Sequence, residues 1–211
     1  MICERSITVD LFNLAAPIFD QAMRISGHHK TLVELADRVK RVEIANKNRK
    51  NEENIKLLDL GGGTGEFVKY LPDNFAVTIA DPSSAMLEKS KNKKHRKKVE
   101  HVLADGAALP FADEQFDYIT ISDALHHFRD VSSALAEARR VLKQGGRLFI
   151  LEFDPAAFLT KVIIFFEKIA GEPVNFFDPS TLEKKIGNNN FKTEHEYLNK
   201  AIYIMNAKKL S

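Results

Sequence analysis

The sequence of 211 residues holds a single cysteine, Cys3, and no tryptophan. One thiol cannot close a disulfide within the chain, so we expect a reducing compartment and a cytoplasmic protein. The first ten residues interleave charges with short apolar pairs, unlike a secretory signal. No run approaches the roughly 20 apolar residues that span a bilayer. Transmembrane and disulfide-stabilised classes are therefore not expected.

Charge of either sign is not in excess, because 31 Lys and Arg stand against 29 Asp and Glu, a formal net charge of +2. So balanced a chain is not drawn as a whole to nucleic acids or membranes, and any attraction requires a local patch. With 44% apolar and 28% charged residues, the composition is typical of a globular protein. We expect one globular unit that needs no metal to fold.

Strand-like and helix-like segments alternate along most of the chain. Seven runs are typical of strands: 55–60, 75–80, 99–104, 116–122, 147–153, 191–197 and 201–207. Four segments are typical of helices: 31–42, 131–142, 156–170 and 179–186. This alternation predicts a doubly wound, Rossmann-like α/β fold, in which a seven-stranded, mostly parallel sheet ends in a C-terminal antiparallel hairpin.

The segment 57–65, LLDLGGGTG, carries a buried-type strand directly into a glycine-rich turn. Glycine tolerates positive φ and lets a ligand approach the main chain closely. Ligands of open α/β sheets bind at the carboxyl ends of the strands, and this is the first such end. The alternative is an ordinary tight turn between a strand and a helix.

The spacing of the glycines argues against phosphate binding. The dinucleotide fingerprint needs a third glycine or alanine where Glu66 stands, and the Gly-Lys-Ser/Thr of a P-loop is missing. What remains is an acidic residue followed by alternate glycines: Asp59, Gly61, Gly63 and Gly65. This pattern suits a cationic ligand that carries an amino acid moiety.

Acidic and polar residues follow the next predicted strands. Asp81 ends the second strand, where a carboxylate can accept both hydroxyls of a ribose, although capping of the following helix is an alternative role. Asp105 closes the third strand, and Ser122 and Asp123 close the fourth. Several polar groups therefore converge on one edge of the sheet.

Five segments in order resemble the motifs of class I S-adenosylmethionine-dependent methyltransferases. They are LLDLGGGTGEF at 57–67, TIAD at 78–81, DGA at 105–107, ALPFADEQFDYI at 108–119 and LKQGGRLFILEF at 142–153. Within that family, LEF at 151–153 and LAAPIFD at 14–20 are most similar to the ubiquinone and menaquinone biosynthesis C-methyltransferases and their small-molecule relatives. The resemblance implies a cofactor-binding methyltransferase domain at 51–211, with a helical cap at 1–50 on the substrate side.

The resemblance implies S-adenosylmethionine as cofactor, S-adenosylhomocysteine as product, and no metal. The methionine part of the cofactor would lie against Gly61, Gly62 and Gly63. Asp59 would orient its amino group directly or through water. Phe19 would close over the sulfonium, since a cation beside an aromatic ring gains roughly 0.5–2 kcal/mol.

The nucleoside part of the cofactor would be held by the next strand ends. The resemblance implies that Asp81 holds the ribose and that Pro82 and Met86 flank the adenine. Four further cofactor-binding residues are expected at the ends of the third and fourth strands: Asp105, which reads the adenine edge with the amides of Gly106 and Ala107, and Ser122.

The implied reaction is in-line methyl transfer to a small, apolar acceptor such as a quinol or phenol. His127 is the candidate general base, and His126 is expected to be a loop residue or one that supports the site without touching the reacting atoms. Alternatives are an RNA or protein methyltransferase and a non-catalytic cofactor-binding protein. Neither the acceptor, nor the methylated atom, nor the oligomeric state follows from the sequence.

Two further segments have competing interpretations. The run 89–98 holds seven lysines and arginines without interleaved aromatic residues, which predicts a solvated helix end and argues against nucleic-acid binding. Peripheral contact with an anionic membrane surface is left open. The helix at 156–170 is rich in phenylalanine and isoleucine, and we expect it to belong to the core, with a substrate lid as the alternative.

Overall fold

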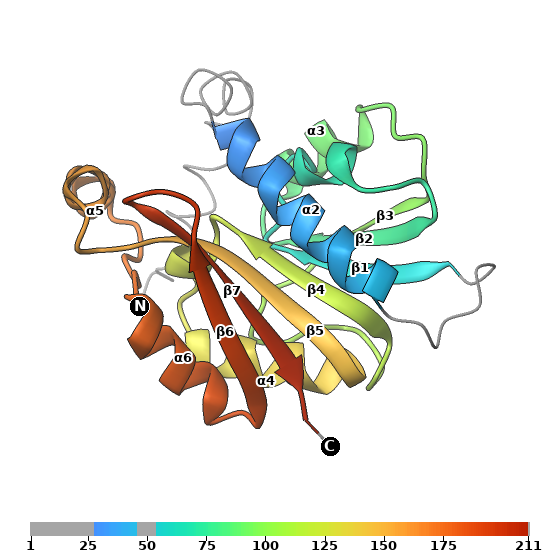
Figure 1. The fold of residues 1–211 in the computed structure, drawn as a ribbon. Helices are drawn as coiled ribbons and strands as arrows, with labels where there is room; N and C mark the ends of the chain where they lie inside the picture. The colour runs from blue at the N-terminus through green and yellow to red at the C-terminus, as the bar shows by residue number, and fades with distance from the viewer. Residues whose placement is uncertain (1–27, 46–53, 211) are drawn as a thin grey trace.

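The computed structural model describes residues 28–45 and 54–210. Phe19 and the rest of the predicted cap outside 28–45 therefore lie outside the described residues. The described chain forms a seven-stranded sheet in the order β3-β2-β1-β4-β5-β7-β6 (Figure 1). The first five strands are parallel, and the closing pair is antiparallel. This confirms the predicted fold class.

The strands are β1 (Ile55–Leu60), β2 (Phe75–Asp81), β3 (Val99–Leu103), β4 (Phe116–Ser122), β5 (Leu142–Phe153), β6 (Phe191–Tyr197) and β7 (Ile202–Lys209). The α-helices are α2 (His28–Ala45), α3 (Ser84–Lys91), α4 (Val131–Val141), α5 (Phe158–Ala170) and α6 (Pro179–Gly187). Two short 3₁₀ helices, η1 (Phe67–Tyr70) and η2 (Leu125–His127), follow β1 and β4. All seven predicted strands and all four predicted helices are present.

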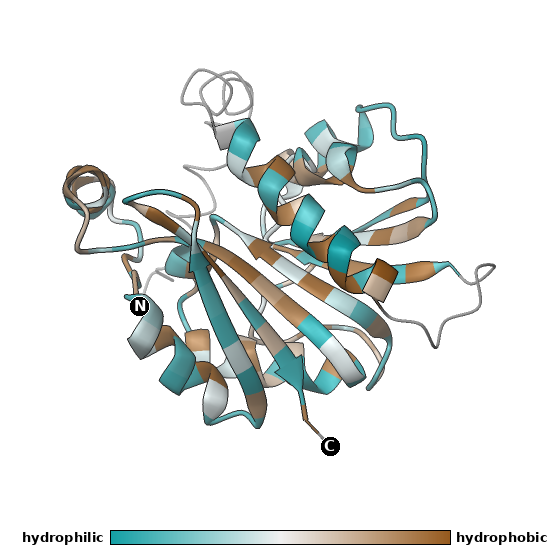
Figure 2. Ribbon diagram, viewed as in Figure 1, coloured by the Kyte–Doolittle hydropathy of each residue, from teal (hydrophilic) through white to brown (hydrophobic). Residues whose placement is uncertain are grey.

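Apolar side chains alternate between the two faces of the sheet and form two cores. On one face, Leu58 and Ile119 pack with α4 and α6. On the other face, Leu57 and Tyr118 pack with α2 and α3. Figure 2 shows the hydrophobic stretches of the strands passing beneath α2. The central strands β1, β2 and β4 are buried from both sides, as expected of a parallel sheet.

Helix α4 begins at the predicted residue, Val131, but ends one residue earlier than predicted. Its N-cap Asp130 accepts a hydrogen bond from the Ser133 N–H at 2.9 Å, which satisfies one of the free amides of the first turn. The helix ends at Val141, and the chain enters β5 at Leu142 rather than after a glycine turn. Gly145 keeps a positive φ of 71° inside β5, where the pairing with β4 shifts register. The predicted strand start at residue 147 was therefore five residues late.

The prediction that α5 belongs to the core is wrong. The exposed fractions of Phe158, Phe166 and Ile169 are 84%, 63% and 69%, and Thr160 is the buried residue of the helix. Figure 1 shows α5 standing apart from the sheet. The periodicity correctly predicted an amphipathic helix, but it does not show whether another part of the protein packs against the apolar side.

The lysine-rich run joins α3 to β3, and several of its side chains are bound within the fold. Lys97 Nζ donates to the carbonyls of Val68 and Leu71, and Lys93 pairs with Glu66 at 3.0 Å. These lysines stabilise the turn after β1 rather than forming a uniform basic face. No helix among the described residues is long and apolar enough to cross a membrane.

Candidate functional site

The glycine turn follows β1 at the carboxyl edge of the sheet. Gly61 and Gly63 have φ values of 72° and 52°, a region that side chains with a Cβ rarely adopt. The Gly61 N–H donates to the Ala80 carbonyl at 2.8 Å, which anchors the turn on β2. A Cβ on Gly63 would meet only Asp81 Oδ2, at 3.9 Å, so a ligand can approach the main chain there.

Asp81 ends β2 and fastens the glycine turn from the neighbouring strand. Its Oδ2 accepts from the Gly63 N–H at 2.9 Å, and its Oδ1 accepts from the Ser83 N–H at 2.8 Å. Burial raises the pKa of Asp81 to about 6, although the two amide donors oppose the shift. The N-cap of α3 is Ser83, whose Oγ accepts from the Met86 N–H at 3.2 Å, so the alternative capping role predicted for Asp81 falls to Ser83. Each oxygen of Asp81 keeps one acceptor direction at the edge of the site.

Asp59 lies directly beneath the turn and is fully buried. Its Oδ1 accepts from Thr120 Oγ1 at 2.9 Å, whereas its Oδ2 is buried without a hydrogen-bond partner among the described residues. Burial, together with the charge of Asp81, raises the pKa of Asp59 to about 7. A Cβ on Gly62 would lie 2.6 Å from Asp59 Oδ2, so a glycine is required above the carboxylate.

The residues predicted near the adenine lie in two segments. Pro82 is exposed after β2, and Met86 is buried in α3 with an exposed fraction of 3%. Asp105 is exposed after β3, and its own Oδ1 accepts from the Ala107 N–H at 3.0 Å. The Ala107 amide is therefore used within the turn, which leaves the Asp105 carboxylate as the stronger candidate for an adenine contact.

Phe128 is a site residue that the sequence analysis did not single out. Its ring lies 3.4 Å from the place that a Cβ on Gly61 would take and 2.9 Å from that of Gly106. It therefore fills the space between the glycine turn and the turn after β3. In the sequence, only its position directly after the two histidines of η2 points to a role in the site. That position does not reveal which way the ring points.

Ser122, at the end of β4, and His126, in η2, lie at the same edge of the sheet. His126 Nδ1 lies 2.8 and 2.9 Å from the two carboxylate oxygens of Glu152 on β5. The ring stacks on Phe176 at a centroid distance of 4.2 Å. Although burial opposes the charge, Glu152 raises the pKa of His126 to about 9. His126 lies in the short turn after β4, as expected, and Glu152 holds it there as a positioned cation.

His127, the predicted base, contacts the His126 ring at a centroid distance of 4.1 Å. Burial and the charge on His126 lower the pKa of His127 to about 3. It is therefore neutral at neutral pH but a weak proton acceptor, because an efficient base has a pKa near the working pH. This environment weakens the case for His127 as the base.

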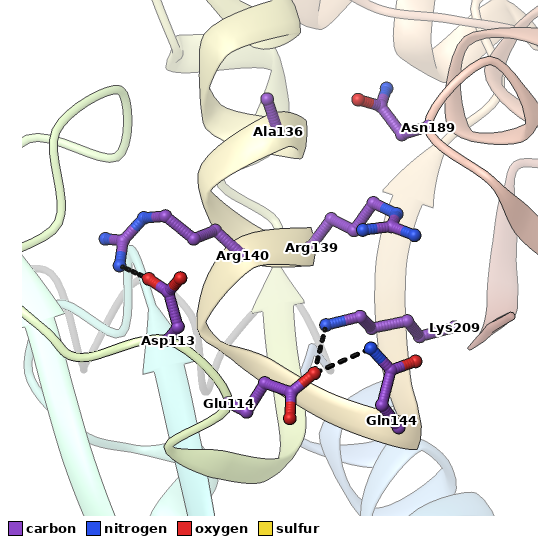
Figure 3. A pocket seen from close by; sticks show the side chains of 8 residues that line it. All are labelled: Asp113, Glu114, Ala136, Arg139, Arg140, Gln144, Asn189 and Lys209. Carbon is purple, nitrogen blue, oxygen red and sulfur yellow. Dashed lines mark hydrogen bonds and ion pairs between the residues drawn. The ribbon is translucent and has the colours of Figure 1, made fainter. Parts of the chain in front are cut away.

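A hollow lies near the starts of β4 and β5, at the end of the sheet opposite the glycine turn (Figure 3). It has a volume of about 440 Å³, and its polar side chains are largely paired with one another. Arg140 is held by Asp113, and Glu114 accepts from Lys209 and Gln144. None of the residues predicted to bind the cofactor lines it.

Residues 58–150 match the family model described as "Methyltransferase domain". The chain is 44% identical over 107 residues to a ubiquinone/menaquinone biosynthesis C-methyltransferase of Francisella philomiragia, covering 47% of this chain and 43% of that protein. It is 42% identical over 108 residues to the enzyme of the same name from Shewanella halifaxensis, with the same coverage. The chain thus spans less than half the length of these relatives.

Solved structures share the fold over most of the chain. A Thermotoga maritima protein described as a possible histamine N-methyltransferase has a TM-score of 0.69 at 21% identity, over 92% of this chain and 98% of that one. Phosphoethanolamine N-methyltransferase 2 of Haemonchus contortus was solved with S-adenosyl-L-methionine. Its TM-score is 0.63 at 16% identity, over 82% of this chain and 52% of that one. At such identities the likeness shows the fold and not the acceptor.

Proposed function

Because residues 58–150 match the methyltransferase domain family, we propose that this chain is an S-adenosylmethionine-dependent enzyme that methylates a small, apolar acceptor such as a quinol or phenol. The observation that carries the proposal is the pair of buried carboxylates, Asp59 and Asp81, at adjacent strand ends. Neither forms an ion pair with a described residue, and Asp59 Oδ2 has no hydrogen-bond donor there. A buried carboxylate without a partner is costly, so a cationic ligand is the natural complement.

The residues present fit S-adenosylmethionine. Gly63 leaves the main chain accessible, whereas Gly61 and Gly62 pack against Phe128 and Asp59. The negative charge of Asp59 beneath the turn favours an ammonium group above. Asp81 keeps free acceptor directions for ribose hydroxyls. Five other residues, Pro82, Met86, Asp105, Gly106 and Ser122, remain predicted contacts at the same edge.

When bound, the cofactor supplies a methyl group already activated by its sulfonium. The task left to the chain is to hold donor and acceptor in line, which can contribute about 7–11 kcal/mol in favourable cases. Phe128 fills the space between the turns and limits the positions open to a ligand. No nucleophile of the protein is required.

Removal of a proton from the acceptor is the weaker part of the predicted mechanism. His127 stays the candidate, but its low pKa makes it suited only to an acceptor that gives up its proton easily. Replacement of His127 by Ala should abolish turnover and preserve cofactor affinity if the residue is the base. Unchanged turnover would remove it from the mechanism.

The proposal of an apolar acceptor has two supports. The curated relatives carry a name that refers to quinone biosynthesis, although the chain spans less than half of them. Helix α5 reaches the site, since Glu167 lies 3.7 Å from His126 Nε2, and the same helix exposes Phe165 and Phe166. We propose that α5 and the cap at 1–50 form the acceptor side, with α5 in the role of the lid.

The test begins with binding. Titration calorimetry should detect S-adenosylmethionine and S-adenosylhomocysteine in the wild-type chain, with Asp73→Ala, an exposed carboxylate, as the control variant. A methyl-transfer assay with quinols and phenols of increasing apolar chain length then identifies the acceptor class. Absence of cofactor binding would refute the function, and transfer to RNA or protein alone would refute the acceptor.

A further inference from the structure

Two imidazoles and several carboxylates meet where η2, the end of β5 and α5 converge. Ligand atoms of His126, His127 and Glu167 all lie within 4.8 Å of one another. Glu172 adds an oxygen 3.9 Å from His127 Nδ1. The proposed cofactor contacts do not use Glu167 or Glu172, and metal binding by His127 would take it out of the role of general base.

His126 is held in the way that metal-binding histidines usually are. Its Nδ1 faces both oxygens of Glu152, which is fully buried, and Phe176 stacks on the ring. A carboxylate behind one ring nitrogen fixes the orientation of the other nitrogen and makes it a better ligand. That other nitrogen, Nε2, lies 3.7 Å from Glu167 Oε1.

Glu167 points into the protein from a helix whose apolar side chains point outward. Its side chain is 19% exposed, and its Oε2 is buried without a hydrogen-bond donor among the described residues. Glu172 Oε2 is likewise buried without a hydrogen-bond donor there. Burial of carboxylates costs free energy unless a cation compensates them, and one protonated His126 already pairs with Glu152.

We propose that His126, His127 and Glu167 bind a divalent first-row transition metal ion, with Glu172 as an additional ligand. Two imidazoles and a carboxylate suit Zn²⁺, Co²⁺, Fe²⁺ or Mn²⁺ better than Mg²⁺ or Ca²⁺. On binding, the metal takes the place of the proton on His126 Nε2, and that proton is released to solvent. A second set, Asp123, His126 and Glu152, is disfavoured because Glu152 already occupies His126 Nδ1.

The experiment uses the untagged chain, freed of metal by a chelator and titrated with Co²⁺. Tight binding should produce the visible absorption of four- or five-coordinate Co²⁺ and raise the melting temperature, because the ion binds only the folded state. Zn²⁺ should displace Co²⁺, and excess Mg²⁺ should not. Neither cofactor nor acceptor is present, so the result is independent of the proposed methyl transfer.

Variants decide which residues bind the ion. Glu167→Gln and His127→Gln, which retain side chains of similar length, should each weaken Co²⁺ binding at least 10-fold. Glu183→Gln is the matched control, because Glu183 also faces a histidine, His195, at 3.0 Å but lies on α6 away from the cluster. Wild-type affinity in both cluster variants, or no spectral change in the wild-type chain, would overturn the proposal.

Discussion

Asp81 Oδ2 accepts a hydrogen bond from the Gly63 N–H at 2.9 Å, so the acid that ends β2 holds the glycine turn that follows β1. The two motifs are eighteen residues apart in the sequence and form one structural unit. A change in the acid therefore alters the turn as well as any direct contact with a ligand.

We predict that Asp81→Ala weakens S-adenosylmethionine binding at least ~10-fold, about 1.4 kcal/mol. Both the ribose acceptor and the support of the turn are lost in this variant. The affinity of Asp81→Asn should fall between those of the wild type and Asp81→Ala, because an amide keeps one acceptor oxygen for the two backbone donors. Titration calorimetry measures both. Wild-type affinity in Asp81→Ala would remove the ribose role.

Asp59→Asn should stabilise the ligand-free protein above neutral pH while weakening cofactor binding. The pKa of Asp59 is raised from its ordinary value of 3.8 to about 7, so its contribution to stability is full below pH 3.8 and is lost as the pH rises through 7. The stability gap between variant and wild type should therefore grow over this range, to at most about 4 kcal/mol.

Urea unfolding from pH 4 to pH 8 measures this gap. Asp73→Asn, in which an exposed carboxylate is replaced, is the control variant. A gap for Asp59→Asn that shrinks as the pH rises would contradict the sign derived from the raised pKa.

Gly62→Ala should abolish tight cofactor binding and destabilise the fold. The new Cβ would lie 2.6 Å from the buried Asp59 carboxylate, and neither the turn nor the strand end can yield cheaply. Gly187→Ala, at the end of α6, meets nothing within 4 Å and should leave binding unchanged. Calorimetry together with thermal unfolding compares the pair. Equal behaviour of the two variants would show that the turn tolerates a side chain.

Phe166→Ala on α5 should change the free energy of unfolding by less than about 1 kcal/mol, because the side chain is 63% exposed. Phe149→Ala, at a fully buried position of β5, should cost about 3–5 kcal/mol. Urea denaturation measures both. Comparable losses would mean that α5 packs against the body of the protein in solution.

Much of the fold could be predicted from local patterns. The boundaries of β1, β4 and β6 follow the predicted runs residue for residue, since the runs are bounded by turn residues. The late start predicted for β5 shows the limit, because Gly145 marks a register shift within the strand rather than the end of a turn. Whether residues 142–146 continue the strand depends on their pairing with β4, which the local sequence does not show.

The sequence by itself determined the α/β class and the strand ends that form the site edge. These follow from periodicity and spacing, which are local properties of the chain. Only the tertiary structure decided that α5 faces outward and that Glu167 meets His126, some forty residues earlier. It also decided that His126 is charged whereas His127 is neutral. Burial and charge depend on which segments pack together, and adjacent histidines with the same local sequence acquire opposite properties from different neighbours.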